Sequence, residues 1–323
     1  MLASALVNGD ASNFEEPILQ IRRRIEELSA LEAEPARQAE IDELRQKLTK
    51  VSLEIYSKLT PWEKTLVARH PQRPYTLDFI ALLFEDFTEI HGDRKFGDDA
   101  AVVTGFARFR GAPCAVVGHQ KGRNTKEKVL RNFGQPRPEG FRKALRVMKM
   151  AEKFKLPIFS FVDTQGAYPG VGAEERGQAE AIAMNLREMA SIEVPIIISV
   201  IGEGGSGGAL ALGVGDRVLM CEHAVYSVIS AEGCAAILWK SAAAAPEAAA
   251  AMKITAQDLK KLNVIDEIVP EPPGGAHSDS QAAADLLAPF LERALKDVQK
   301  LKGSALLEER YKKFRRMGVF EKS

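Results

Sequence analysis

Residues 194–212 read VPIIISVIGEGGSGGALAL, and this stretch decides the fold. A run of aliphatic residues stops at Gly202, a glycine-rich segment continues to Gly208, and alanine and leucine residues follow. The pattern is typical of a buried strand, a glycine turn and the start of a helix. Because glycine has no side chain, the unpaired N–H groups of such a turn can approach an anionic oxygen closely. The segment therefore predicts an anion or oxyanion hole.

The residues on both sides of this turn alternate between strand and helix periods. Apolar periodicity predicts a hairpin over 101–117, a helix over 140–154, a strand over 158–162, a helix over 174–189 and the strand that begins at 194. Strands and helices in this order favour parallel βαβ units with right-handed crossovers. Ligands of such sheets bind at the carboxyl ends of the strands, where the glycine turns fall.

The two ends of the chain read as helical. Residues 18–28 and 41–55 predict two amphipathic helices joined near Pro35, which either fold back on the body or pack against another subunit. Helices after Gln281 lead to a basic tail that we expect to be solvated, with Arg310, Lys312, Lys313, Arg315 and Arg316. We expect a helical arm over 1–60, one α/β domain over 61–300 and a helical tail over 301–323.

Composition excludes several classes of protein. The 44 Lys and Arg residues balance 44 Asp and Glu residues, so we expect no nucleic-acid partner and no anionic membrane partner. The three cysteines have no CxxC spacing, which argues against a disulfide framework or a zinc site and favours a reducing, cytoplasmic setting. No apolar run is long enough to span a membrane, and residues 1–13 lack the basic start of a secretion signal, so we expect a soluble protein.

Two other motifs overlap the glycine turn. Gly204 to Gly208 matches the G-x-S-x-G pattern of serine hydrolases, with Ser206 as nucleophile, Asp258 or Asp266 as the acid and His277 as the base. His277 lies in a Pro/Gly/Ser segment, so this hypothesis is the weaker one. The same residues spell G-x-G-x-x-G with Glu222 downstream, but Gly213 leaves too short a helix for a dinucleotide-binding crossover.

Other segments suggest contacts with a ligand. The second glycine-rich turn, 163–177, is long enough to be a binding loop. A basic stretch between a strand and a helix offers possible phosphate contacts from Lys121, Arg123, Lys126 and Arg131. The Met-Lys pairs at Lys149 and Lys253 resemble a biotin-carrier site, but both fall in segments of helical period, so we expect no covalently bound cofactor.

Four blocks of sequence resemble the alpha subunit of the bacterial acetyl-coenzyme A carboxylase carboxyltransferase. The similarity runs from about Phe14 to the region of His277, and the blocks are 69–75 (RHPQRPY), 118–123 (GHQKGR), 166–177 and 201–208. The resemblance implies an α/β fold of the crotonase-like (ClpP/crotonase) type, a spiral of ββα units, here with an N-terminal helical hairpin and C-terminal helices. It also implies that main-chain amides stabilise the enolate of a substrate.

The implied reaction is transfer of the carboxyl group of carboxybiotin to acetyl-CoA. The product is malonyl-CoA, used for fatty acid synthesis, and the reaction belongs to an ATP-dependent complex. By the resemblance, the N–H groups of Gly204 and Gly205 form the oxyanion hole for the biotin enolate, and Gly207 and Gly208 shape the turn. The binding loop then contributes the biotin or substrate contacts of Gly166, Ala167, Tyr168, Gly170 and Gly172.

The resemblance also implies that this chain supplies half of a shared site. Its partners would be a beta subunit with a zinc ribbon, a biotin carboxyl carrier protein and biotin carboxylase. The three cysteines of this chain lack the spacing of a zinc ribbon, which agrees with that division. A heterotetramer of two alpha and two beta chains is expected. Two positions depart from the family pattern, since Gln165 and Ala231 each replace a proline. Loss of a fixed φ makes each loop more flexible in the unfolded chain, without removing a hydrogen-bond donor.

Overall fold

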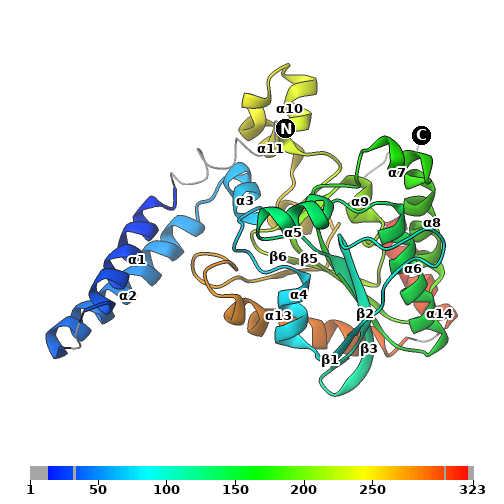
Figure 1. The fold of residues 1–323 in the computed structure, drawn as a ribbon, viewed down its shortest axis with the longest axis horizontal. Helices are drawn as coiled ribbons and strands as arrows, with labels where there is room; N and C mark the ends of the chain where they lie inside the picture. Colours follow the sequence, from blue (N-terminus) through cyan, green and yellow to red (C-terminus); the bar gives the residue numbers. More distant parts are fainter. Residues whose placement is uncertain (1–13, 32–33, 302, 319–323) are drawn as a thin grey trace.

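The computed structural model describes residues 14–31, 34–301 and 303–318. The helical arm is confirmed as α1 (Glu16–Ser29) and α2 (Pro35–Tyr56), which run side by side and project from the body (Figure 1). The root of the arm packs against the body, because Ile18 and Tyr56 share a buried cluster with Leu59 and Val67. The expectation for residues 1–13 lies outside the described residues, and the domain boundaries at 60 and 300 stay predictions.

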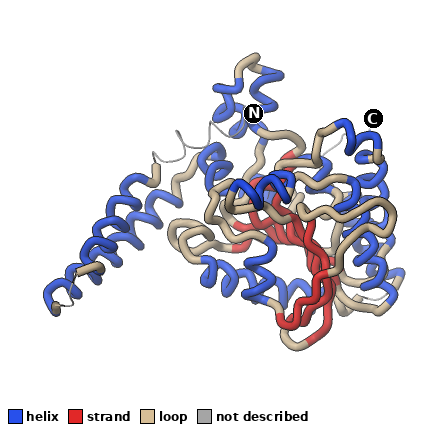
Figure 2. Tube along the Cα trace, viewed as in Figure 1, coloured by secondary structure: helices blue, strands red, loops and turns tan. Residues whose placement is uncertain are grey.

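One mixed sheet forms the centre of the body (Figure 2). Its order is β1-β2-β3-β4-β5-β6-β8, with β7 beside the far end of β5. β2 pairs antiparallel with both β1 and β3, and the pairs from β3 onward are parallel. The strands are β1 (Glu85–Glu89), β2 (Val102–Phe109), β3 (Ala112–His119), β4 (Ile158–Thr164), β5 (Ile196–Gly205), β6 (Arg217–Cys221), β7 (Val225–Ser227) and β8 (Glu267–Val269).

Helices cover both faces of the sheet, so β4 and β5 are buried along their whole length. Figure 1 shows α6 and α8 on one side of β2 and β3, and α4 and α13 on the other. The helices of the body are α3 (Pro61–Ala68), α4 (Thr76–Leu83), α5 (Thr125–Leu130), α6 (Pro138–Lys153), α7 (Val171–Glu175), α8 (Gln178–Ser191), α9 (Ser206–Leu210), α10 (Ala231–Leu238), α11 (Ala245–Met252), α12 (Ala256–Lys261), α13 (Ser280–Val298) and α14 (Ser304–Arg315), with short 3-10 turns η1 (Asn132–Gly134) and η2 (Ala242–Ala244).

The structure corrects three sequence-based expectations about local structure. The strand does not stop at Gly202 but continues to Gly205, because the glycine-rich part still pairs with β4 and with β7. The helix expected over 174–189 is two helices, separated by Gly177 at a φ of +80°. The basic stretch contains a helix, α5, whose first turn is capped by the Asn124 side chain.

The basic tail is not uniformly solvated. Arg310 is 2% exposed, and its guanidinium bonds both carboxylate oxygens of Asp216 at 2.8 Å and the carbonyls of Met189 and Ile192 at 2.7 Å. Such a dense set of acceptors compensates the cost of burying the charge. Arg310 therefore anchors α14 to the body.

None of the described helices combines the length and apolar character that a membrane crossing needs.

Candidate active site

The two glycine turns meet at the carboxyl ends of β4 and β5, two neighbouring strands in the middle of the sheet. Thr164 at the end of β4 lies opposite Gly204 of β5, after a register shift that follows Val162. The other edge of the same glycine segment pairs with β7, where Gly204 lies opposite Tyr226 and Gly205 opposite Ser227. The predicted meeting of the two turns is thus seen, with the first turn built into the sheet.

Glycine is required at two positions of the first turn, because the backbone of the second turn lies against it. A Cβ atom on Gly205 would lie 2.1 Å from the Gln165 carbonyl oxygen. One on Gly208 would lie 2.5 Å from the Gly166 carbonyl carbon and 2.6 Å from the Ala167 nitrogen. The two main chains therefore touch, and this contact fixes the position of one turn relative to the other.

The chain changes direction directly after Gly205. Gly205 is the N-cap of α9, and Ser206 follows with a φ of +53°, a strained value for a residue with a side chain. Gly204 and Gly205 are buried, whereas Ser206 and Gly207 are half-buried. The part of the turn that faces the surface of the isolated chain is therefore its second half.

Asp163 holds the strand just before Gly204. Its carboxylate Oδ1 accepts the Glu203 N–H at 2.9 Å and the Lys121 ammonium at 2.5 Å. The carboxylate is 1% exposed at the residue level, so the lysine neutralises a charge that would otherwise be costly to bury. A side chain on Gly202 would displace this group, because a Cβ there would lie 2.4 Å from Oδ1.

A second ion pair connects the glycine strand to α10. Arg69, at the end of α3, donates to both carboxylate oxygens of Glu203 at 2.9 and 2.7 Å. The same guanidinium donates to Glu232 of α10 at 2.5 Å. Burial opposes ionisation of Glu232, yet the Arg69 contact keeps the pKa of that carboxyl below its usual range. Arg69 thus joins three elements around the site.

The loop over 163–177, which the sequence predicts to bind a ligand, lies against the first turn through the backbone of Gln165, Gly166 and Ala167. The Tyr168 ring lies under the Arg137 guanidinium at 4.8 Å, and the Tyr168 N–H donates to the Pro136 carbonyl at 2.9 Å. Gly170 leaves room for this ring, since a Cβ there would lie 2.3 Å from it. Gly166 is held by the Thr164 hydroxyl at 3.1 Å. Sequence reasoning placed Tyr168 here but did not find its stacking partner.

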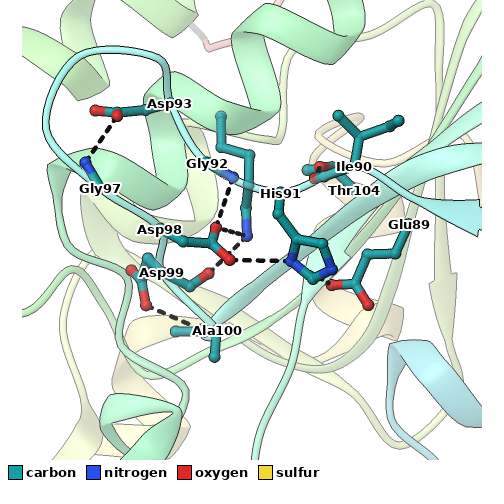
Figure 3. Close-up of polar contacts among 12 residues, drawn as sticks. Glu89, Ile90, His91, Gly92, Asp93, Gly97, Asp98, Asp99, Ala100 and Thr104 are labelled. Atoms are coloured by element: carbon teal, nitrogen blue, oxygen red, sulfur yellow. Dashed lines mark hydrogen bonds and ion pairs between the residues drawn. The ribbon is translucent and has the colours of Figure 1, made fainter.

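The loop between β1 and β2 contacts Arg137 through Asp99. Figure 3 shows the polar contacts that hold this loop around Asp98. Asp98 accepts from the Gly92 N–H at 2.9 Å and from the fully buried Lys143 ammonium at 2.6 Å, and it lies 3.0 Å from the His91 ring. Burial opposes ionisation of Asp98, but its bond with Lys143 lowers the pKa of the carboxyl well below the usual value. The next residue, Asp99, accepts the Arg137 N–H at 2.6 Å.

The possible phosphate contacts are largely engaged within the chain. Lys121 bonds Asp163, Arg123 bonds Asp78 at 2.5 Å, and the Arg131 guanidinium donates to the Ala100 carbonyl at 2.7 Å. Lys126 is exposed on α5 and is the one of these four residues without a hydrogen bond or ion pair to the described residues. Sequence reasoning could not see these pairs, because each partner is distant along the chain.

The serine hydrolase hypothesis finds no assembled triad. The His277 ring lies with Glu15 at 3.2 Å, with Tyr56 at 3.3 Å, and stacked on His70 with 3.9 Å between ring centroids. Thr255 caps α12 by accepting the Asp258 N–H, and the Asp258 carboxylate accepts the Thr255 hydroxyl at 2.8 Å. Asp266 binds the Val218 N–H and Lys313. Within the described residues no hydrogen bond joins the Ser206 hydroxyl to a histidine. His277 belongs to the root of the arm.

The remaining sequence motifs have structural explanations. The helix after the glycines, α9, is as short as the dinucleotide argument expected. Lys149 lies inside α6 as predicted, whereas Lys253 is the residue after α11, at a φ of +56°, and not within a helix. Ala231 is the first residue of α10, where the Ser230 hydroxyl caps the helix, so the missing proline does not remove the cap.

Sequence reasoning missed His119, which is fully buried at the end of β3. Its Nδ1 accepts the Asp163 N–H at 3.3 Å, and its Nε2 lies 3.1 Å from the Gly208 carbonyl. Burial lowers the pKa of this imidazole to about 3. A histidine at the carboxyl end of an apolar strand next to β4 was the available signal.

Comparison with known sequences gives one consistent result. The sequence profile of a family described as acetyl co-enzyme A carboxylase carboxyltransferase-like matches residues 11–318. A protein of Syntrophotalea carbinolica named acetyl-coenzyme A carboxylase carboxyl transferase subunit alpha is 58% identical over 311 residues, which are 96% of this chain and 98% of the relative. The protein of the same name from Bordetella pertussis is 56% identical over 310 residues, 95% of this chain and 97% of the relative.

Solved structures share the fold at low sequence identity. A transcarboxylase 12S structure with methylmalonyl-coenzyme A and methylmalonic acid bound aligns with a TM-score of 0.58 and 22% identity, over 72% of this chain and 43% of that one. A Pseudomonas malonate decarboxylase hetero-tetramer in complex with coenzyme A aligns with a TM-score of 0.56 and 19% identity, over 67% of this chain and 86% of that one. At such identity these likenesses concern the fold alone.

Proposed function

The chain belongs to the acetyl co-enzyme A carboxylase carboxyltransferase-like family, and from this premise we propose that its glycine turn stabilises the enolate of biotin during carboxyl transfer. Its fold is crotonase-like, as the sequence predicted. It is a carboxyltransferase subunit of acetyl-CoA carboxylase, so it acts with partner subunits. The observation that supports the proposal is the position of Gly204 and Gly205 at the carboxyl end of β5, where Gly204 lies opposite Thr164 and Gly205 lies against the Gln165 backbone.

The proposed reaction uses carboxybiotin on a carrier protein and acetyl-CoA as substrates. Breaking the N–CO₂ bond of carboxybiotin releases CO₂ and leaves the bonding electrons on the ureido group, whose oxygen becomes negative. The biotin anion then removes a proton from the methyl carbon of acetyl-CoA, and that carbon attacks CO₂ to give malonyl-CoA. No side-chain base is needed. Main-chain donors held at the developing oxyanion before reaction contribute about 3–4 kcal/mol each.

In this proposal the N–H groups of Gly204 and Gly205 are the donors, and Gly207 and Gly208 shape the turn. The two donors are buried, and the residues that follow them, Ser206 and Gly207, are half-buried. Gly166, Ala167, Tyr168, Gly170 and Gly172 form the facing wall for biotin or acetyl-CoA. The Arg137–Tyr168 stack supports this role, because it fixes the Tyr168 ring against the residue that precedes α6.

For the phosphates of coenzyme A, we propose Lys126 as the contact with the strongest structural support. Its ammonium is exposed, whereas Lys121, Arg123 and Arg131 would have to exchange partners within the chain before binding a phosphate. Lys126→Ala should raise KM for acetyl-CoA and leave kcat unchanged. Lys128→Ala on the same short helix is the matched control.

The site is proposed to be completed by a beta subunit with a zinc ribbon, in a heterotetramer that also works with a carrier protein and biotin carboxylase. Exposed apolar side chains around the turn support a partner surface: Val171 and Val228 are 73% and 76% exposed, and Leu238 on α10 is 67% exposed.

Two hollows of about 600 and 580 Å³ lie over the C-terminal helices and include no residue of either glycine turn.

The proposal is tested by reconstitution. The purified chain is assayed for malonyl-CoA formation from acetyl-CoA and free carboxybiotin, with and without a zinc-ribbon partner. Product should form only when both are present. Ser206→Ala should retain substantial turnover, because the serine hydroxyl takes no part. Loss of turnover in this variant with its thermal unfolding unchanged would favour the hydrolase alternative and overturn the proposal.

A further inference from the structure

Asp163 is linked to both ends of the oxyanion turn by buried hydrogen bonds, directly at one end and through His119 at the other. On the strand side, the Asp163 carboxylate accepts the Glu203 N–H at 2.9 Å, one residue before Gly204. On the helix side, the Asp163 N–H donates to His119 Nδ1 at 3.3 Å, and the opposite ring nitrogen lies 3.1 Å from the Gly208 carbonyl. Residues 204–207 lie between these two fixed points.

The partners of His119 determine its tautomer. A backbone N–H can only donate, so Nδ1 has no proton, and a backbone carbonyl can only accept, so Nε2 carries the proton. The ring is 0% exposed, and no water molecule is needed to complete either bond. Burial, together with the nearby Lys121 charge, keeps the imidazole neutral at ordinary pH, so the same arrangement persists across the working range.

The bond to Gly208 acts where the turn has least freedom of its own. Gly208 belongs to α9, and its carbonyl is held from the side of β3 while its Cα faces the backbone of Gly166 and Ala167. Because Gly208 is fixed by contacts on two sides, the positions of the preceding residues, Gly204 to Gly207, depend on it. A ring that released this carbonyl would allow the turn to move relative to β4.

We propose that His119 is a positioning residue for carboxyl transfer, which sets the Gly204 and Gly205 donors by holding the Gly208 carbonyl against the end of β4. The inference rests on the proposed function of the turn. His119 contacts neither substrate in this scheme, because it lies beneath the turn and is fully buried.

Two substitutions separate the two hydrogen bonds of the ring. The side-chain amide nitrogen of His119→Gln extends as far as Nε2 and can still donate to the Gly208 carbonyl. The side-chain oxygen of His119→Asn can replace Nδ1 as acceptor for Asp163, but it leaves the Gly208 carbonyl without a donor. The buried His223, whose Nδ1 has no hydrogen-bond partner among the described residues, offers His223→Asn as a control.

In the reconstituted complex, His119→Asn should lower kcat by about 100-fold, as expected for a displacement of about 1 Å, with KM for acetyl-CoA unchanged. His119→Gln should retain most of the wild-type kcat. Equal loss in both variants, or a loss that appears in KM and not in kcat, would overturn the inference, because a purely structural role gives no such separation.

Hydrogen–deuterium exchange on the full chain gives a second readout that does not depend on turnover. Amides of residues 204–208 should exchange at least about tenfold faster in His119→Asn than in wild type, as expected if one buried hydrogen bond of about 1.4 kcal/mol restrains them. They should exchange at the wild-type rate in His119→Gln and His223→Asn. Unchanged exchange in His119→Asn refutes the positioning role. If amides exchange faster in His119→Asn but the wild-type complex makes no malonyl-CoA, the proposed function is refuted, whereas the role of His119 in positioning the turn is supported.

Discussion

Adding one methyl group at Gly208 tests whether the contact between the two glycine turns sets the rate. The new Cβ of Gly208→Ala would lie 2.5 Å from the Gly166 carbonyl carbon, whereas ordinary contact begins at 3.4 Å. Both neighbouring atoms belong to the main chain, so no side-chain rotation relieves the overlap. The turns must separate by about 0.9 Å, the difference between these two distances.

A displacement of that size in a catalytic group costs about 100-fold in rate, equivalent to about 2.7 kcal/mol of transition-state stabilisation. We therefore expect kcat for malonyl-CoA formation by the reconstituted complex to fall by this factor in Gly208→Ala. Gly207→Ala should lose much less, because its Cβ would meet only the Ile182 side chain, at 3.4 Å. Gly97→Ala, with nothing within 4 Å, controls for loss of glycine as such.

The assay follows malonyl-CoA formation at saturating acetyl-CoA, with the thermal unfolding of each variant measured alongside. The reasoning fails if Gly208→Ala turns over within threefold of wild type, or if Gly207→Ala is equally slow. It also fails if the loss in Gly208→Ala is explained by unfolded protein, which the thermal melt would show. A bulkier change at Gly205 is less informative, since its Cβ would lie only 2.1 Å from the Gln165 carbonyl oxygen.

Three further predictions concern stability. Arg310→Met should lower the free energy of unfolding by about 3–5 kcal/mol in urea, because it leaves the buried Asp216 charge unpaired, whereas Arg315→Met should change it little. Burial alone would raise the pKa of Glu271, but its two hydrogen bonds with Arg73 outweigh burial and hold the pKa at about 2. The pair should therefore stabilise the fold above about pH 4.5 and lose that contribution as the pH falls toward 2. In unfolding followed by circular dichroism, the stability of Glu271→Gln should depend less on pH in this acid range than that of wild type. Gly177→Ala should destabilise the chain by about 1 kcal/mol in thermal melts, because it forces a side chain into a left-handed φ of +80°, and an unchanged melt would contradict this.

The sequence was sufficient for the order of strands and helices around the two turns. Aliphatic runs that end in glycine mark β4 and β5, and both turns were placed at one edge of the sheet. The extent of β5 was not predictable, since glycine is usually a strand breaker and only pairing with β4 and β7 keeps residues 202–205 in the sheet. The short strands β1, β6 and β8 were also missed.

Charged residues were the least predictable part of the site. The sequence suggested a phosphate contact for Lys121 and a solvated side chain for Arg310, yet each neutralises a buried carboxylate that is far away along the chain. His119 gave the opposite problem, because one histidine after an apolar strand is a weak signal until the fold brings Asp163 and Gly208 to its two nitrogens. Such pairs depend on tertiary contacts, which local pattern does not encode.

Arg69 has one further consequence for how the molecule responds to a neighbour. A single guanidinium is shared between Glu203 in the sheet and Glu232 on α10, whose outer surface exposes Ile237 and Leu238. If α10 shifts under a docked protein, the guanidinium either follows the helix and releases Glu203, or stays and releases Glu232. A movement of α10 would thereby change the contacts of Glu203, the residue before Gly204, although the docked protein does not touch Glu203.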